Sequence, residues 1–265
     1  MTGWRQLELE LDAWARAGET ATLWWRDDDA VSVTPALRRL IELTAAVHVP
    51  PVPLCLAVVP TLADTTLPTL LTPCDHVTVL QHGYAHINNA PAGTKKAEFP
   101  TGRDLPGGLT ELRTGQERLR ALFDGQALPV LVPPWNRIDP AIVNRLPEAG
   151  VAGLSTYGPR RAAMAGRSVV QVNTHIDIMN WHAGRRFIGL EAALKLAIDH
   201  LAARRQNSVD GTEVTGLLTH HLVHDDDAWA FIDAFLRLTT GHAAVRWLHG
   251  REVFSRHGPA REGPA

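Results

Sequence analysis

The sequence predicts an α/β protein with a mainly parallel sheet that is covered by helices. About seven short apolar runs rich in Val, Leu and Trp alternate with amphipathic stretches, which is the pattern of repeated strand and helix units. Polar residues collect where several of these runs end. Hydrophobic residues make up 45% of the chain and charged residues only 20%, which indicates a compact globule rather than a disordered chain or a solvated coiled coil.

The apolar runs give the expected strands in chain order. They cover residues 21–27, 52–58, 76–82, 128–134, 151–157, 169–175 and 215–221. Helices are expected between them, and several begin with Thr, Asp or Pro, which helix N-termini favour. These helices cover residues 35–48, 109–124, 139–149, 189–204 and 226–239. A further helix is expected over residues 1–18, where Trp4, Leu7, Leu11 and Trp14 form an apolar stripe.

The chain is expected to form a single domain over residues 1–265. It has no Ser/Gly-rich linker and no internal repeat of 20 to 50 residues. Residues 88–108 are expected to form one long loop over the site. Such a loop is either a mobile lid or a wall of a substrate site, and surface disorder is the alternative.

Charge and hydropathy exclude several classes of partner. The net charge is −2 and the pI is near 6.7, so no basic face is expected to bind nucleic acid or an anionic membrane. The chain lacks both an 18-residue apolar run and the apolar stretch of a signal peptide, which predicts a cytoplasmic protein. A small molecule or a sugar is the expected substrate, and the sequence does not indicate the oligomeric state.

Five of the expected strands end in polar clusters. Because the carboxyl ends of parallel strands share one face, these clusters are expected to converge. They are Arg26–Asp29, His82–His86, Trp135–Arg137, His175–Asp177 and His220–His221. Imidazole and carboxylate groups bind catalytic divalent metals, and an open coordination position activates water. The set therefore favours a metal-dependent hydrolase.

Each cluster alone has a simpler explanation. A spacing of four between histidines arises by chance in a chain with 13 of them, so the pair His82 and His86 gains weight from its place after an apolar strand. Residues 27–29 could form a solvated turn, or Arg26 could balance their charge. Residues 225–227 precede a helix, and capping explains them better than chemistry.

Taken in order, these motifs resemble those of the polysaccharide deacetylase family, also called the NodB-homology or carbohydrate esterase 4 family, over residues 20–255. The segment Arg26-Asp27-Asp28-Asp29-Ala30 stands where the family has Thr-Phe-Asp-Asp-Gly. The resemblance makes Asp28 the general base and Asp29 a metal ligand, whereas a shift by one position would select Asp27 and Asp28. His82 and His86 match the family's His-x-x-x-His and are the other two implied metal ligands.

The third and fourth motifs are altered. In place of Arg-x-Pro-aromatic the chain has Val132-Pro133-Pro134-Trp135, so the arginine that holds the base in the family is absent. Arg26 or Arg137 is expected to replace it. The segment Asp177-Ile178-Met179-Asn180-Trp181 resembles the family's Asp-x-x-Asp-Trp, with Asn180 in place of the second Asp.

The last motif concerns the proton donor. Leu218-Thr219-His220 resembles the family's Leu-x-His, which makes His220 the implied general acid and Asp177 the residue that tunes it. His221 is the second candidate for the acid.

The resemblance implies a distorted (β/α)7-type barrel of mainly parallel strands with outer helices. It implies hydrolysis of an N-acyl or amide bond with one divalent metal ion, of which zinc is the first choice. Substrate contacts are expected from Trp135, Trp181, Arg26, Arg137, Tyr84 and His221, although core packing is the alternative for the tryptophans. Two other hypotheses are a non-catalytic carbohydrate- or metabolite-binding domain that keeps the metal pocket, and a hydrolase of small formylated or cyclic amides.

Overall fold

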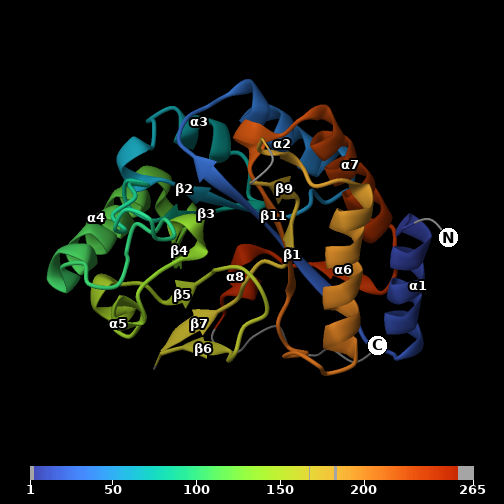
Figure 1. Ribbon diagram of the computed structural model, residues 1–265. Helices are drawn as coiled ribbons and strands as arrows, with labels where there is room; N and C mark the ends of the chain where they lie inside the picture. The colour runs from blue at the N-terminus through green and yellow to red at the C-terminus, as the bar shows by residue number, and fades with distance from the viewer. Residues whose placement is uncertain (1–2, 167, 182–183, 256–265) are drawn as a thin grey trace.

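The computed structural model describes residues 3–166, 168–181 and 184–255, which form one curled sheet with helices around it (Figure 1). The strands run in the order β6-β7-β5-β4-β3-β2-β1-β11-β8, and β12 pairs with β1. Their bounds are β1 Ala21–Ala30, β2 Leu54–Val58, β3 Val77–His82, β4 Ala127–Val132, β5 Gly153–Leu154, β6 Met164–Ala165, β7 Val169–Gln171, β8 Ile176–Asp177, β11 Thr215–Thr219 and β12 Val245–Trp247. All pairs in this sheet are parallel except β6 with β7.

One continuous segment, residues 169–177, joins the two ends of the sheet. Its first part, β7, pairs with β5, and its last part, β8, pairs with β11. Between them the backbone N–H of Thr174 donates to Thr156 on the β5 side, and that of His175 donates to Gly216 on the β11 side. The segment therefore closes the sheet into a distorted barrel, which confirms the expected fold class.

Helices cover the outside of the barrel. They are α1 Gly3–Arg16, α2 Pro35–Ala46, α3 Leu67–Leu71, α4 Leu105–Phe123, α5 Pro140–Val143, α6 Leu190–Arg205 and α7 Asp226–Thr240. The short α8, Gly250–Val253, instead packs Val253 into the interior cluster with Trp24. A small hairpin of β9 (Met179–Asn180) and β10 (Arg186–Phe187) lies between β8 and α6. None of the described helices is long and apolar enough to cross a membrane.

Two expected helices have different bounds in the structure. The helix expected from residue 109 begins at Leu105, because the carboxylate of Asp104 accepts the backbone N–H of Gly107 and caps the helix there. The helix expected over 139–149 is the short α5 followed by a 3-10 turn, Leu146–Ala149. Pro147 has no N–H to continue the hydrogen bonds of α5, which explains the break. The short elements α3, α8 and β12 were not expected from the sequence.

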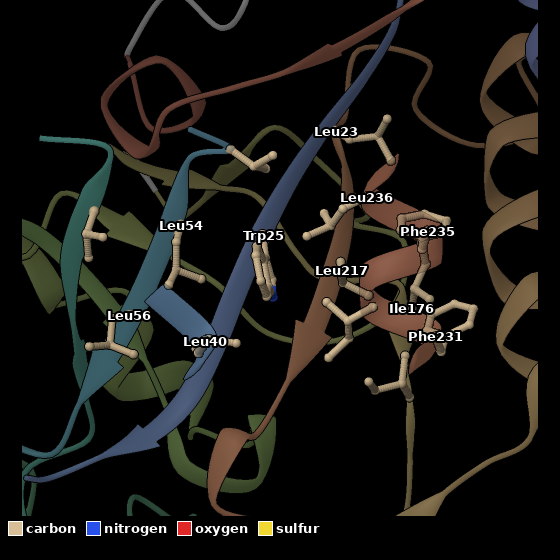
Figure 2. Packing of buried hydrophobic residues seen from close by; sticks show 14 of the residues in the cluster. Leu23, Trp25, Leu40, Leu54, Leu56, Ile176, Leu217, Phe231, Phe235 and Leu236 are labelled. Atoms are coloured by element: carbon tan, nitrogen blue, oxygen red, sulfur yellow. The ribbon is translucent and has the colours of Figure 1, made fainter. Parts of the chain in front are cut away.

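Strand β1 is buried on both faces, and its two adjacent tryptophans pack into different parts of the core. Trp25 lies in the layer between the sheet and the outer helices, with Leu217 and Phe235 in the same cluster (Figure 2). Trp24 belongs to the interior cluster, with Leu80 and Val132. Both tryptophans have no exposed surface, so core packing rather than substrate contact is their role. This burial on both faces explains why the first residues of β1 form a continuous apolar run in the sequence.

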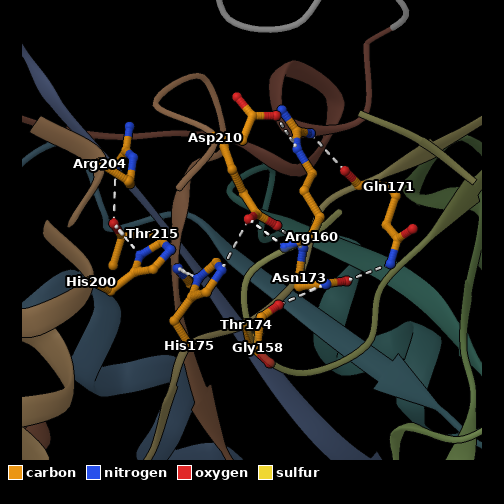
Figure 3. Close-up of polar contacts among 12 residues, drawn as sticks. Gly158, Arg160, Gln171, Asn173, Thr174, His175, His200, Arg204, Asp210 and Thr215 are labelled. Carbon is orange, nitrogen blue, oxygen red and sulfur yellow. Dashed lines mark hydrogen bonds and ion pairs between the residues drawn. The ribbon is translucent and has the colours of Figure 1, made fainter. Parts of the chain in front are cut away.

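A polar cluster is buried where β11 begins, at the opposite end of that strand from His220 (Figure 3). The rings of His175 and His200 stack with their centroids 3.4 Å apart, and Nε2 of His175 lies 3.3 Å from Oε2 of Glu213. The backbone N–H groups of Arg160 and Asn173 donate to the two oxygens of Glu213.

These three side chains could geometrically surround a metal ion, but the hydrogen bonds indicate a structural role. Nδ1 of His175 accepts the backbone N–H of Gly216 at 3.0 Å, so the ring proton lies on Nε2. That nitrogen faces the Glu213 carboxylate and has no free lone pair for a metal. Burial lowers the pKa of His200 to about 2 and also lowers the pKa of His175.

The buried ring of His200 makes stability depend on pH. Its pKa is about 2 in the folded protein and 6.5 ordinarily, so between these values the unfolded chain binds a proton that the folded chain does not. Stability should therefore fall as the pH decreases below 6.5, by about 1.4 kcal/mol per pH unit from this residue alone. Urea unfolding of His200→Phe between pH 7 and pH 4.5 should show a shallower pH dependence than the wild type.

The exposed His48 supplies the control, since His48→Phe should keep the wild-type pH dependence. If the unfolding free energies of His200→Phe and the wild type changed equally with pH, His200 would be protonated in the folded protein.

Candidate metal centre and surrounding site

Three side chains converge at the carboxyl ends of β1 and β3. Oδ1 of Asp29 lies 3.0 Å from Nε2 of His82 and 3.2 Å from Nε2 of His86. The three ligand atoms are all within 4.8 Å of one another. Asp29 has a φ of 69° and lies where the register between β1 and β2 shifts, so β1 leaves its extended path at this residue. The structure thus brings together the three residues predicted to bind a metal.

The hydrogen bond of His82 leaves the ring nitrogen that faces Asp29 free to bind a cation. Nδ1 of His82 donates to the carbonyl oxygen of Val132 at 3.0 Å, which leaves the lone pair of a neutral ring on Nε2, facing Asp29. Burial opposes ionisation of Asp29, but when the Nε2 atoms that face it carry protons, His82 and His86 donate hydrogen bonds that outweigh burial and hold the pKa of Asp29 below the ordinary value. An ionised carboxylate and two imidazole nitrogens at one point form a donor set that fits a divalent metal.

A buried glutamate fixes the loop between the two histidines. Glu98 is 1% exposed, and its carboxylate accepts the backbone N–H groups of Tyr84 at 3.0 Å and Ala85 at 2.7 Å. Gly83 has a φ of 58°, and a Cβ atom there would lie 1.9 Å from Oε2 of Glu98. The loop therefore requires glycine at this position so that Glu98 can approach the backbone.

Glu98 belongs to the long loop expected over residues 88–108. Ala97, Glu98 and Phe99 are buried, and residues 105–108 belong to α4. The middle of the loop is thus anchored next to the metal ligands, so surface disorder is the wrong description for residues 97–99. Glu98 could not be predicted from the sequence, because a single acidic residue in a loop carries no pattern.

Arg26 holds the predicted general base. Its Nε lies 2.8 Å from Oδ1 of Asp28, and its Nη2 lies 3.0 Å from Oδ2. The guanidinium also donates to Ser155 Oγ and Asn136 Oδ1, and Arg26 has no exposed surface. Arg137 is elsewhere: it is exposed and donates to the carbonyl of Lys96. Of the two arginines considered as replacements, Arg26 is therefore the one in contact with Asp28.

His220 lies beside Asp28, at the end of β11. Its Nε2 is 3.9 Å from Oδ2 of Asp28, and its ring packs edge to face with Trp181, with centroids 4.5 Å apart. The carboxylate of Asp177 accepts Nε1–H of Trp181 at 2.8 Å and the backbone N–H of Met179. Burial raises the pKa of Asp177. Within the described residues Nδ1 of His220 has no hydrogen-bond partner, so Asp177 reaches His220 through Trp181.

His221 does not fit the expectation of a substrate contact. Its side chain has no exposed surface, and Nδ1 lies 2.5 Å from Oδ1 of Asp27. The carboxylate of Asp27 raises the pKa of His221 despite burial. Asp27 faces His221 rather than His82 and His86, so the geometry favours Asp28 over Asp27 as the candidate base. The error arose because two adjacent histidines give no sign of which one is buried.

Aromatic side chains lie on two sides of the site. Trp135 packs on His86 with ring centroids 4.6 Å apart and is half-buried, while Trp181 is 39% exposed beside His220. Both remain candidates for substrate contact. The ring of Tyr84 packs partly against an apolar cluster that includes Phe99, and its backbone N–H donates to Glu98.

Comparison with known proteins identifies the fold. No protein-family model matches the sequence, and no curated protein matches it significantly. Among solved structures, a protein from Mycobacterium smegmatis that is provisionally described as a polysaccharide deacetylase matches with a TM-score of 0.67 and 17% identity, over 92% of this chain and 91% of that chain. The 4-alpha-glucanotransferase from Thermococcus litoralis matches with a TM-score of 0.57 and 12% identity, over 90% of this chain and 40% of that chain. The fold implied by the motif resemblance is thereby confirmed.

The contact between Glu98 and the histidine loop makes a prediction about metal affinity. In Glu98→Gln one carboxylate oxygen becomes an NH₂ group that opposes a backbone N–H, so His86 should be held less firmly. Zinc affinity, measured by competition with a chromophoric chelator, should fall about ten- to a hundredfold, as for other residues that orient metal ligands.

Glu148→Gln is the matched control, because Glu148 pairs with Arg145 three residues away, at a distance in the chain from Glu98 and the histidine loop. Unchanged affinity in Glu98→Gln would mean that Glu98 does not position His86.

Proposed function

We propose that the protein is a metal-dependent hydrolase of an N-acyl or amide bond. The observation that carries this proposal is the convergence of the Asp29 carboxylate with Nε2 of His82 and His86, with Nδ1 of His82 already engaged by a backbone carbonyl. Two imidazoles and one carboxylate form a recurrent catalytic zinc set. The likeness to a protein described as a polysaccharide deacetylase supports the same class of reaction.

Asp29, His82 and His86 would hold the metal ion. When bound, a divalent ion supplies Lewis acidity for water and for the scissile carbonyl, which is why no serine or cysteine nucleophile is needed. Zinc is the first choice for this donor set, although cobalt, nickel or manganese also binds such ligands.

The remaining residues have roles in proton transfer. Asp28 accepts a proton from the attacking water, and the guanidinium fork of Arg26 keeps its carboxylate in place. His220 donates a proton to the departing amine, with Trp181 and Asp177 beside it. Trp135, which packs on His86, and Trp181, which packs on His220, contact the substrate.

An acylated amine is the substrate class, and an N-acylated amino sugar is the first member to test. A formylated or cyclic amide is the second. The rival hypothesis of a binding domain without turnover rests on the altered third and fourth motifs, and above all on the missing arginine of the third. The contact of Arg26 with both oxygens of Asp28 supports catalysis.

Hydrolysis should require both metal and Asp28. Zinc-loaded protein should release acetate or formate from a panel of N-acylated amino sugars, formylated amines and cyclic amides, and chelator should abolish release. Asp28→Asn should lower kcat by about 10²- to 10⁴-fold, because general base catalysis is lost, while zinc still binds. Tight ligand binding without turnover by the zinc-loaded wild type would support the binding domain instead.

Arg26 should matter for turnover and Arg137 should not. Arg26→Lys keeps the positive charge but loses the two-pronged contact with Asp28, and a misplaced base costs up to about a hundredfold in rate. We expect kcat to fall by about ten- to a hundredfold at unchanged zinc content. Arg137→Lys serves as the control, and equal activities of the two variants would disprove the role of Arg26.

A further inference from the structure

The backbone that presents His220 is held by side chains rather than by a neighbouring strand. β1 and β11 pair in parallel up to Asp27 and Thr219. Beyond this pair, the N–H of His220 donates to Nε2 of His224 at 3.1 Å, and the N–H of His221 donates to Oδ2 of Asp27 at 3.0 Å. The chain then enters the 3-10 turn His221–Val223. The geometry of this turn therefore depends on the side chains that bind its N–H groups.

Asp27 is the centre of these contacts. Its carboxylate has no exposed surface and also accepts the hydroxyl of Thr219 at 2.6 Å and Nδ1–H of His221 at 2.5 Å. Nε1–H of Trp25 donates to the Thr219 hydroxyl oxygen at 2.8 Å, which directs the hydroxyl proton toward Asp27. Both oxygens of Asp27 are thus bonded to β11 or to the turn that follows it.

The ring of His220 has no comparable support. Within the described residues its Nδ1 is buried without a hydrogen-bond partner, and its Nε2 lies 3.9 Å from Asp28. The ring packs against Trp181, a contact that allows sliding. The position of the ring is therefore set mainly by the backbone of residues 219–221, which Asp27 binds.

We propose that the buried Asp27–His221 pair is a positioning element that fixes His220 relative to Asp28 and the metal ligands. The inference rests on the proposed function, in which His220 protonates the leaving amine. Asp27, Asp28 and Asp29 are consecutive in β1. A carboxylate that binds the turn after β11 therefore couples the proton donor to the base and to the metal through adjacent peptide units.

The test compares two substitutions of His221 on two substrates. His221→Leu removes the donor to Asp27, whereas in His221→Asn the side-chain amide nitrogen takes the place of Nδ1 and keeps the donor. The substrates are an amide and a nitrophenyl ester of the same acyl group. An amine must be protonated to leave, but nitrophenolate leaves without a proton, so only the amide reaction needs His220 in place.

We expect His221→Leu to lower kcat for the amide by about tenfold or more, while kcat for the ester and the zinc stoichiometry stay within about twofold of the wild type. His221→Asn should restore the amide reaction to within about threefold of the wild type. His242→Leu is the control, since His242 pairs with Asp12 between α1 and α7, and it should change neither reaction. If His221→Leu does not fold, Thr219→Val removes one hydrogen bond to Asp27 at nearly constant volume and should give a smaller loss in the same direction.

Equal losses on the amide and the ester would overturn the inference, because they would mean that the pair supports the fold or the metal rather than His220. An unchanged amide reaction in His221→Leu would overturn it as well. In both cases the metal-dependent activity of the wild type would still stand. Failure of the zinc-loaded wild type to hydrolyse either substrate would instead overturn the proposed function, and this inference with it.

Discussion

The site depends on the compensation of three consecutive carboxylates at the end of a buried strand. Asp27 and Asp28 are almost fully buried, and Asp29 is only partly exposed. Two unit charges of like sign about 4 Å apart repel by about 4 kcal/mol at an effective dielectric constant of about 20, so the run needs a partner for each charge. Asp27 has His221, Asp28 has Arg26, and Asp29 has two imidazole nitrogens. Most of the interactions around the site can be traced to one of these three contacts.

The alternation of side chains along β1 decides which partner each carboxylate finds. Residues two apart share a face of the sheet, so Arg26 lies on the same face as Asp28 and contacts its carboxylate with both Nε and Nη2. Asp27 points to the other face, with Trp25, and meets Thr219 of the adjacent strand. The positive φ of Asp29 ends the alternation and brings its carboxylate to the histidines that follow β3. Three consecutive residues of one strand therefore make contacts in three different directions.

Local patterns in the sequence predicted most of the sheet and the convergence of the candidate metal ligands, because these depend on strand ends that share one face. Glu98 and Ser155 could not be predicted in the same way. Their partners are distant in sequence, and neither residue belongs to a repeating pattern. Very short strands such as β8 were also out of reach, since two residues carry no periodicity. The burial of His221 was missed because the chain turns directly after Thr219, so strand alternation no longer applies there.

The fold alone does not decide the chemistry, because a glucanotransferase and a protein described as a deacetylase share this scaffold. The argument for a metal comes from the contacts of Asp29. A proton on Nε2 of His82 would satisfy one contact of Oδ1, but a second donor is needed for the contact with His86. Without a metal, His82 must be a cation to donate to Asp29, because its Nδ1–H already binds a carbonyl, whereas His86 can donate as a neutral ring with its proton on Nε2. A divalent ion satisfies all three groups at once with neutral rings, and it places a positive charge at the end of an acidic run whose other two members already have partners in His221 and Arg26.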